Sequence, residues 1–454
     1  MDDRSNRYCI IGAGPSGLAT ARAFSRAGIS FDVLERHGDV GGIWNLENEK
    51  SPVYESAHFI SSKTLSAFDD FPMPPGYPDY PGWRLILDYI RAFAVEHDLR
   101  RHVQFGADVE RVLPRNGGWH VHLANGEERL YRGIVVAVGH NWDPLMPEYA
   151  GSFTGKVYHS FHYKSADEFR GKRVLVVGGG NSGCDIACDA AISASRAFIS
   201  LRRGYHFLPK HILGKPTDVF FRGGPEPPAW LAQPLLAFLL RLLLGDLTRY
   251  GLPRPDHKVL ASHPIMNTQL LHHLAHGDIT PKPDVHELRG GRVIFTDGSE
   301  EDIDVIVYAT GYTPAIPFLE QSLSPITRQL FLNIFPRSHR DLFIVGHFET
   351  DGAAYPIVSK QAKLIGTLIQ ARESNPEAAA AFDRKQLGSP PDLSGGIHYI
   401  SSPRHSNYVQ FEAYGHYLDR AVKELDKGRQ EGGERRREEV PGKQGARSSN
   451  AGTQ

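Results

Sequence analysis

The sequence predicts an α/β fold with two Rossmann-like dinucleotide-binding units, one inserted in the other, and three observations support this fold class. A glycine-rich GxGxxG loop occurs twice, at Gly12–Gly17 and Gly178–Gly183, each time after an apolar strand and before a helical run. A hairpin follows each loop, with a turn at Asn125-Gly126, which suits type I′, or at Asp297-Gly298, and then a buried-looking strand ends at Gly139 or Gly311. The two spans are 127 and 133 positions long, so one plan is used twice.

Length and composition limit the class of protein. The chain has 454 residues, enough for about three domain-sized units, and a formal net charge of -1 that gives no overall indication of nucleic-acid binding. The three cysteines, Cys9, Cys184 and Cys188, include no CxxC motif and cannot form a disulfide framework. The polar N-terminus lacks the pattern of a signal peptide. We therefore expect a reducing, cytoplasmic location.

The first glycine-rich loop has the residues that a bound dinucleotide requires. Gly12 makes the tight turn, Gly14 lets the backbone approach a pyrophosphate, and Gly17 lets the helix pack on the strand. The helix that begins near Pro15 offers free amides to the phosphates. Glu35, 23 positions after Gly12, can accept hydrogen bonds from a ribose. We expect a nucleotide here rather than an ordinary strand–helix turn. The expected contact residues are Gly12, Ala13, Gly14, Pro15, Ser16, Gly17, Glu35 and Arg36.

The second loop predicts a different nucleotide. Its glycines repeat the spacing, but the position 23 residues after Gly178 is Leu201, followed by Arg202 and Arg203. No carboxylate stands there for a ribose 2′-hydroxyl, and two guanidinium groups suit a 2′-phosphate. NADPH is therefore expected rather than NADH, and the alternative is that the arginines only form a solvated strand end. The expected contact residues are Gly178, Gly180, Asn181, Ser182, Gly183, Arg202, Arg203, Ala309, Thr310 and Gly311.

The segment between the two loops carries a family resemblance. It reads FTGKVYHSFHY, in which Phe153, Gly155, His159 and Tyr163 form the pattern FxGxxxHxxx(Y/F). With a GxGxxG loop on either side, this order resembles the class B flavin-containing monooxygenases. The motifs GGIW, DFPMP and ATGY match that family as well. The resemblance extends from about residue 8 to residue 425.

This resemblance implies FAD in the first unit and NADPH in the second, in a three-layer FAD/NAD(P)-binding fold. We expect an FAD-binding domain at residues 1–165 and 312–426, an inserted NADP-binding domain at 166–311, and a disordered tail at 427–454. Helical stretches of the returning segment, such as VSKQAKLIGTLIQA, look amphipathic and should pack on the FAD-binding domain. The implied enzyme is an NADPH-dependent monooxygenase, whose flavin C4a-hydroperoxide oxygenates a small organic substrate at nitrogen or sulfur. The cofactor then supplies the hard chemistry.

The resemblance also implies the composition of the reaction centre. Gly42 and Trp44 should line the flavin. His159 should couple nicotinamide binding to the active site, with a hinge or packing role as the alternative. The residues expected to act in catalysis share a place near the flavin ring or the nicotinamide, and they are Ser61, Ser62, His159 and Gln361.

Two departures from the family pattern leave alternatives open. Ile60 stands where the family commonly has an asparagine, so an NADPH oxidase or flavin reductase without productive oxygen transfer is one alternative. Tyr163 followed by Lys164 stands where Baeyer–Villiger enzymes usually have tryptophan followed by proline or aspartate, which disfavours ketone oxygenation without excluding it. A nucleotide-sensing protein without turnover is a third alternative, against which the two complete loops argue.

The most apolar run of the sequence is Trp230–Leu244. It contains Pro234 and Arg241 and is shorter than the ~20 residues that span a bilayer, so a buried or lid-like segment is favoured over a membrane-surface helix. Histidine pairs such as His272 and His273 lack a recognised ligand spacing, and no metal site is expected. The expected partners are a small organic substrate and molecular oxygen, without nucleic acid or a transmembrane segment, and a homodimer is left open.

Overall fold

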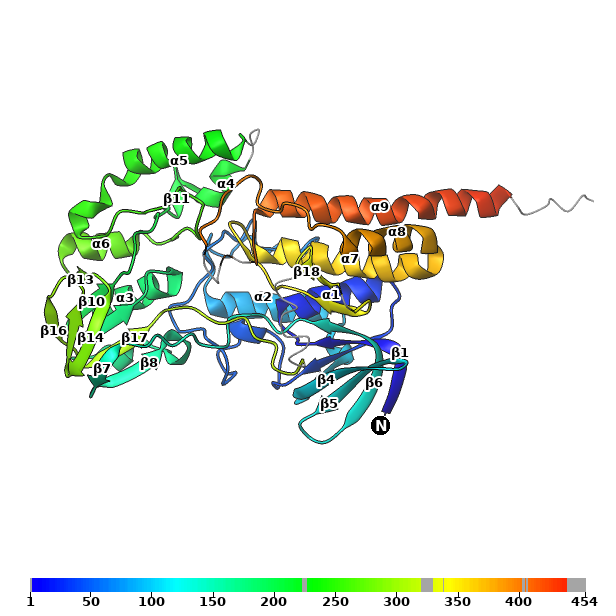
Figure 1. The fold of residues 1–454 in the computed structure, drawn as a ribbon, viewed down its shortest axis with the longest axis horizontal. Helices are drawn as coiled ribbons and strands as arrows, with labels where there is room; N and C mark the ends of the chain where they lie inside the picture. Colours follow the sequence, from blue (N-terminus) through cyan, green and yellow to red (C-terminus); the bar gives the residue numbers. More distant parts are fainter. Residues whose placement is uncertain are drawn as a thin grey trace, which may run out of the picture.

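The computed structural model describes residues 2–222, 227–319, 330–337, 339–401, 405 and 407–438. Within these residues the chain forms two α/β units that lie side by side in Figure 1. The first unit, on the right of the figure, contains both the N-terminal segment and the last helix, whereas the middle of the chain forms the second unit. The two Rossmann-like units expected from the sequence are confirmed.

The sheet of the first unit is parallel at its centre and ends in an antiparallel meander. Its strands are β1 (Asp2–Ile11), β2 (Phe31–Glu35), β3 (Val103–Phe105), β4 (Val109–Arg115), β5 (Gly118–Leu123), β6 (Glu128–Val136) and β20 (Leu342–Ile344). They stand in the order β3-β2-β1-β6-β5-β4, and β20 pairs with β6. Strands β3, β2, β1, β6 and β20 run parallel, and their buried parts are continuous apolar runs because both faces are covered.

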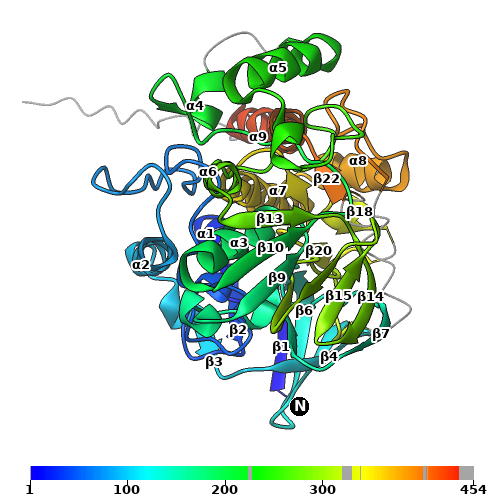
Figure 2. The same ribbon diagram turned by 90° about the vertical axis from the view of Figure 1, so that its left-hand side faces the viewer.

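The second unit repeats this plan with a separate small sheet. Its parallel sheet has the order β13-β10-β9-β17-β8, formed by β13 (Ile279–Lys282), β10 (Arg196–Ser200), β9 (Arg173–Val177), β17 (Val305–Tyr308) and β8 (Lys156–His159). The small sheet has the order β16-β15-β14-β7, formed by β16 (Glu300–Asp302), β15 (Arg292–Phe295), β14 (Val285–Gly290) and β7 (Ala150–Phe153). Figure 2 shows the two sheets of this unit facing the viewer.

The border between the two units lies earlier than the sequence indicated. β7 and β8 precede residue 166, yet β7 pairs with β14 and β8 pairs with β17. The expected border at 165/166 is therefore wrong, because the connector between the loops supplies edge strands to both sheets of the second unit. The two crossings of the chain between the units are hydrogen-bonded to each other. The Leu145 amide donates to the Gly311 carbonyl at 3.0 Å, and the Thr313 amide donates to the Asp143 carbonyl at 2.8 Å.

The two expected hairpins form, but their turns differ from the type expected. Gly126 has a φ of +84° and Gly298 a φ of +81°. Asn125 and Asp297 before them do not take positive φ, whereas a type I′ turn requires it at both central positions. The type I′ assignment is therefore wrong. Each hairpin has a longer loop, in which only the glycine is left-handed.

The remaining elements cover these sheets. The helices of the first unit are α1 (Pro15–Arg26), α2 (Trp83–Glu96), α7 (Ala354–Ser374), α8 (Pro376–Leu387) and α9 (Phe411–Glu438). Those of the second are α3 (Asn181–Ser193), α4 (Thr217–Phe221), α5 (Ala229–Leu244) and α6 (Gln269–His276). The short strands are β11 (His211–Ile212), β12 (Lys215–Pro216), β18 (Leu330–Phe331), β19 (Phe335–Pro336), β21 (Glu349–Thr350) and β22 (Tyr408–Val409).

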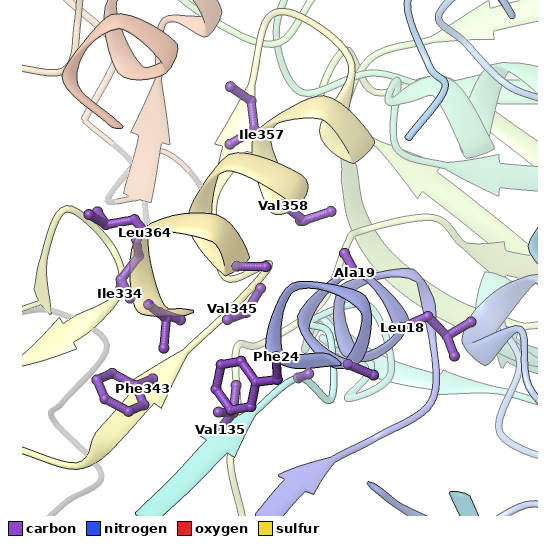
Figure 3. Packing of buried hydrophobic residues seen from close by; sticks show 14 of the residues in the cluster. Leu18, Ala19, Phe24, Val135, Ile334, Phe343, Val345, Ile357, Val358 and Leu364 are labelled. Carbon is purple, nitrogen blue, oxygen red and sulfur yellow. The ribbon is translucent and has the colours of Figure 1, made fainter. Parts of the chain in front are cut away.

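The largest core cluster joins the two ends of the chain. Phe24 of α1 lies beside Val135 of β6 in Figure 3, and Leu18, Phe343 of β20 and Val358 of α7 belong to the same cluster. All of these side chains are buried. The expected packing of the amphipathic returning helices on the first unit is confirmed.

The apolar run at 230–244 forms the helix α5, and this helix is not buried. Among its residues only Gln233 and Leu240 are buried. Figures 1 and 2 both place α5 on the outside of the molecule, with α4 near it. The expectation of a buried segment is wrong. Composition alone does not show whether the rest of the fold offers a surface that covers the segment. Within the described part of the chain, no helix is long and apolar enough to cross a membrane.

The predicted disordered tail begins too early. The helix α9 continues to Glu438, so residues 427–438 are helical and not disordered. Arginine, glutamate and lysine are good helix formers and the next proline is Pro441, although Gly428, Gly432 and Gly433 are poor helix formers. The rest of the predicted tail, residues 439–454, lies outside the described residues.

Candidate functional site

A cavity of about 1660 Å³ has both glycine-rich loops on its wall. Its lining includes Gly14 and Glu35 of the first unit and Gly180 and Arg202 of the second. All four follow parallel strands at the carboxyl ends, where open α/β sheets bind their ligands. One cavity can therefore bring two nucleotides together.

The first loop is a close-fitting backbone turn. Gly12 has a φ of +104°, and a Cβ atom there would lie 2.7 Å from the Ala137 carbonyl oxygen. A Cβ atom on Gly17 would lie 1.8 Å from the Gly12 oxygen, so no larger residue fits without moving the helix. α1 begins after Gly14 with no acidic residue in its first turn and no side chain hydrogen-bonded over its end. Its free amides are available to a phosphate.

Glu35 is fixed beside this loop. The carboxylate is buried, and it accepts hydrogen bonds from the Ala13 amide at 2.7 Å and from the His37 amide at 2.9 Å, one on each oxygen. Each oxygen has a further lone pair for a ribose hydroxyl. Arg36 lies over the Trp142 ring, 5.8 Å from its centroid, and both side chains line the cavity. This geometry fits the ribose-binding role expected for Glu35.

The second loop repeats this geometry. Gly178 has a φ of +120°, and a Cβ atom there would lie 2.4 Å from the Ala309 oxygen. A Cβ atom on Gly183 would lie 2.0 Å from the Gly178 oxygen. α3 begins after Gly180, again with no acidic residue in its first turn and no side-chain cap. Asn181 uses its side-chain oxygen to accept from the Met266 amide at 2.9 Å, so it holds a neighbouring loop in place.

The two arginines lie where a 2′-phosphate would be expected. Arg202 and Arg203 follow β10 directly and both line the cavity. The Arg203 guanidinium stands 5.9 Å from the centroid of the Tyr205 ring, and its buried Nε donor has no acceptor among the described residues. A buried donor without an acceptor is costly, and an anion would satisfy it. These residues fit NADPH.

The predicted contacts of the flavin ring lie against the first loop. Gly42 has a φ of +57°, and a Cβ atom on it would lie 3.0 Å from the Gly14 Cα atom. Trp44 lines the cavity and meets the Phe59 ring edge-on at 5.0 Å. The close approach of the Gly42 turn narrows the space beside the pyrophosphate-binding loop. This arrangement fits a flat ring held next to a glycine-rich turn.

The structure brings only one of the two serines to the cavity. Ser61 lines it, with its hydroxyl 2.7 Å from the Ser66 hydroxyl. Ser62 is fully buried behind the wall, and its amide donates to the Asp218 carboxylate at 2.6 Å. Contact with a ligand is therefore open to Ser61, whereas Ser62 holds the loop.

Gln361 and His159 are also behind the wall. Gln361 is 0% exposed, accepts from the Gly346 amide at 2.9 Å and donates to the Tyr414 hydroxyl at 2.7 Å. It positions Gly346, which lines the cavity. His159 is buried at the end of β8, with its ring 5.1 Å from the ring of Tyr312, another lining residue. Both side chains can act on the site only through these neighbours.

Sequence reasoning missed a partly buried acid at the junction of the units. Asp185 of α3 accepts from the Tyr54 hydroxyl at 3.1 Å and from the Asn267 amide at 2.7 Å. Burial raises the pKa of Asp185, and the nearby His58 opposes this shift. Tyr54 and Asp185 both line the cavity. An acidic residue between Cys184 and Ile186, on the side of α3 that packs inward, was the signal that could have revealed it.

Burial of His159 predicts a pH-dependent stability. Burial lowers the pKa of His159 from 6.5 to about 4, so the folded protein resists protonation that the unfolded chain accepts between these values. The free energy of unfolding should therefore fall as the pH falls from 6.5 towards 4, by about 3 kcal/mol for this group. His159→Gln should show a smaller loss between pH 7 and pH 5 in urea unfolding. Exposed His272→Gln is the control, and equal pH dependence in both variants would contradict the assignment.

The two glycine-rich loops, which we call the nucleotide cradles, have matched geometry and line one cavity. The first lies beside a carboxylate and the second beside two arginines. This arrangement defines a flavoprotein oxidoreductase that binds two nucleotides. The chain belongs to the flavin-binding monooxygenase-like family, whose family model matches residues 5–383. It is an NADPH-dependent flavin monooxygenase, and its cofactors are FAD and NADPH.

Relatives of known sequence support this assignment. Flavin-containing monooxygenase 5 of Mus musculus is 33% identical over 396 residues, which cover 79% of this chain and 72% of that protein. Dimethylaniline monooxygenase (N-oxide-forming) 2 of Rattus norvegicus is 34% identical over 386 residues, with coverage of 79% and 72%. A probable indole-3-pyruvate monooxygenase of Arabidopsis thaliana is 35% identical over 331 residues, with coverage of 70% and 77%.

Solved structures share the fold. S-allyl-L-cysteine S-oxygenase from Allium sativum has a TM-score of 0.64 at 21% identity, and the match covers 96% of this chain and 94% of that one. Cyclohexanone monooxygenase with bound ε-caprolactone has a TM-score of 0.74 at 16% identity, with coverage of 94% and 99%. At these identities the likeness shows the fold alone.

Proposed function

We propose that this enzyme transfers one atom of molecular oxygen to a nitrogen or sulfur atom of a small organic substrate, with NADPH as the reductant. The observation that supports this proposal is the shared cavity, which both nucleotide cradles and the Ser61 loop line. Bound FAD would supply the oxygen activation, and amines and thioethers are nucleophiles that need no protein base.

The residues of the chain then have positioning roles. Gly12, Gly14 and the first turn of α1 would hold the FAD pyrophosphate, and Glu35 the ribose. The second loop and the arginine pair would hold NADPH. We assign the ring contacts to Gly42, Trp44 and Ser61, and indirect roles to Ser62, His159 and Gln361. His159 would be neutral at pH 7, because burial lowers its pKa to about 4.

Lys164 favours heteroatom over ketone oxygenation. Its ammonium group donates to the backbone carbonyls of Ser51, Val53 and Phe161, so it joins the connector to the loop that precedes Tyr54. Baeyer–Villiger enzymes usually have proline or aspartate at this place, after a tryptophan. The relative from Rattus norvegicus is named as an N-oxide-forming monooxygenase, which supports the same choice.

A panel of a tertiary amine, a thioether and a cyclic ketone tests the proposal. NADPH consumed, hydrogen peroxide released and product formed are measured for each substrate with the FAD-loaded enzyme. We expect an N-oxide or a sulfoxide in amounts close to the NADPH consumed. An ester from the ketone, without oxygenated amine or thioether, would overturn the proposal in favour of a Baeyer–Villiger reaction.

Ile60 supports a second candidate, an NADPH oxidase that releases peroxide. The side chain lines the cavity beside Ser61 and packs against Leu208 and Leu240, so it offers no hydrogen bond there. One added hydrogen bond is worth about 1 kcal/mol, or roughly fivefold. The family commonly has an asparagine at this position. If the absence of its side-chain amide uncouples NADPH oxidation from oxygen transfer, Ile60→Asn should lower the peroxide released per NADPH about fivefold, whereas the control Ile60→Leu should not. A peroxide yield unchanged in Ile60→Asn would contradict this role of residue 60.

A further inference from the structure

We propose that the outward face of α5 docks this enzyme on the surface of an anionic lipid bilayer. Six large apolar side chains are exposed on this helix, and five of them, Trp230, Leu231, Leu235, Phe238 and Leu242, lie on one side, apart from Leu243. At about 100° per residue they fall within about 140° of the helix circumference, so they form one stripe. Trp230 is 75% exposed, Phe238 68% and Leu242 72%.

The polarity of α5 is the reverse of that expected for a helix on the surface of a water-soluble protein. Gln233 faces inward, where its side-chain amide donates to the Val259 carbonyl at 2.8 Å. Leu240 packs inward against Leu208 and Met266. The helix is thus held by its inner side, and the fold does not need the apolar stripe. A function outside the fold accounts better for such a surface.

This concentration of apolar side chains is local. Six of the fourteen exposed large apolar side chains of the described residues belong to α5. Leu213, in the tight turn between β11 and β12, and Phe221, at the end of α4, belong to the chain segment that leads to α5. The others include Val95 on α2 and Leu387 on α8, which lie on different helices.

The charges around the stripe favour a bilayer over other occupants. Within residues 211–258, the described residues include six exposed lysines and arginines and two exposed aspartates; two of these cations, Arg222 and Arg254, pair with Glu412 and Asp246. Cations beside an apolar face with tryptophan and phenylalanine suit anionic headgroups, and Arg241 within the stripe can extend its charge to them. A second copy would bring two basic surfaces together. Residues 439–454 have no aromatic residue and only one large aliphatic residue, Val440, to cover the stripe.

The proposed docking face lies opposite the cavity wall. Leu236 and Leu240 on the inner side of α5 belong to the same apolar cluster as Ile60, which lines the cavity. Docking through the outer side would therefore hold this part of the wall about one helix diameter, roughly 10 Å, from the membrane surface. The helix is too short to span a bilayer, so the protein would lie on the membrane rather than cross it.

Flotation of the full-length, FAD-loaded protein with lipid vesicles tests the proposal. We expect binding to vesicles of phosphatidylcholine mixed with phosphatidylglycerol, and about tenfold weaker binding to phosphatidylcholine alone or at high salt. Phe238→Glu with Leu242→Glu should lower binding at least about tenfold. The matched control, Val95→Glu with Leu387→Glu, places two carboxylates at similarly exposed apolar positions elsewhere and should bind like the unmodified protein.

Three results would overturn the proposal. One is an unmodified protein that does not float with the anionic vesicles. Another is an equal loss of binding in the control variant. The third is a dimer in light scattering, without vesicles, that the Phe238→Glu and Leu242→Glu changes convert to a monomer, because a second copy would then cover the face. FAD content and melting temperature check the fold of each variant. Flotation does not depend on turnover, so its result is separate from the test of the reaction.

Discussion

Gly17→Ala should give a protein without FAD, whereas Gly183→Ala should give a yellow protein that NADPH does not reduce. The added Cβ atom would lie 1.8 Å from the Gly12 oxygen in the first case and 2.0 Å from the Gly178 oxygen in the second. Each overlap involves backbone, so the helix must move away from the strand and carry its phosphate-binding amides with it. A cost of about 3 kcal/mol lowers the affinity of each nucleotide roughly 100-fold.

Flavin absorbance per protein and stopped-flow bleaching of the flavin by NADPH measure the two effects separately. Gly38→Ala is the control, because a Cβ atom at that position has no atom within 4 Å and the residue does not require positive φ. A Gly17→Ala protein that purifies with a full complement of flavin would show that the first cradle has been assigned wrongly. Loss of both cofactors in Gly183→Ala would show instead that the two units do not bind independently.

The double change Arg202→Ala and Arg203→Ala should raise the KM for NADPH about 100-fold and leave that for NADH within about threefold. Two charge-assisted hydrogen bonds to the 2′-phosphate would be lost, each worth roughly 1.5 kcal/mol, and NADH does not make them. The unsatisfied Nε donor of Arg203 is the structural reason to expect an anion there. Initial rates of flavin reduction with each nucleotide provide the measurement.

Arg170→Ala is the matched control for this pair. Its guanidinium is exposed and pairs with Asp167, away from the residues that line the cavity. It should change neither KM. If the double variant raises the KM for NADPH and the KM for NADH equally, the arginines do not bind the 2′-phosphate. They would then only form a solvated strand end.

The repeated plan could be predicted because it depends on local chain geometry. A turn such as that at Gly12 requires positive φ and a bare Cα, and this requirement is written in the loop sequence. Glu35 and Arg202 follow from counting along a strand, since the end of that strand fixes their place beside the loop. The returning helices followed from apolar periodicity, which α7 and α9 satisfy on the first core.

The features that the sequence did not indicate depend on partners distant in sequence. The side chain of Gln361 is hydrogen-bonded to Gly346 and Tyr414, and nothing near Gln361 in the sequence indicates these bonds. Asp185 needs Tyr54, more than a hundred positions earlier, to form its cluster. Composition favoured a buried or lid-like segment for α5, although only Gln233 and Leu240 of this helix are buried. In each case the role of a side chain depends on the residues that it contacts in the folded chain. A single stretch of sequence does not contain those residues.

The closing of the first unit by the end of the chain has a consequence for biosynthesis. β20 completes the sheet next to β6, and α7 covers α1, but both emerge from the ribosome only after the inserted unit has been made. The second cradle, complete in sequence at Gly311, is thus free to fold while the first still lacks its cover. Flavin would then be incorporated late, so the order in which the cofactor sites mature is the reverse of their order along the polypeptide.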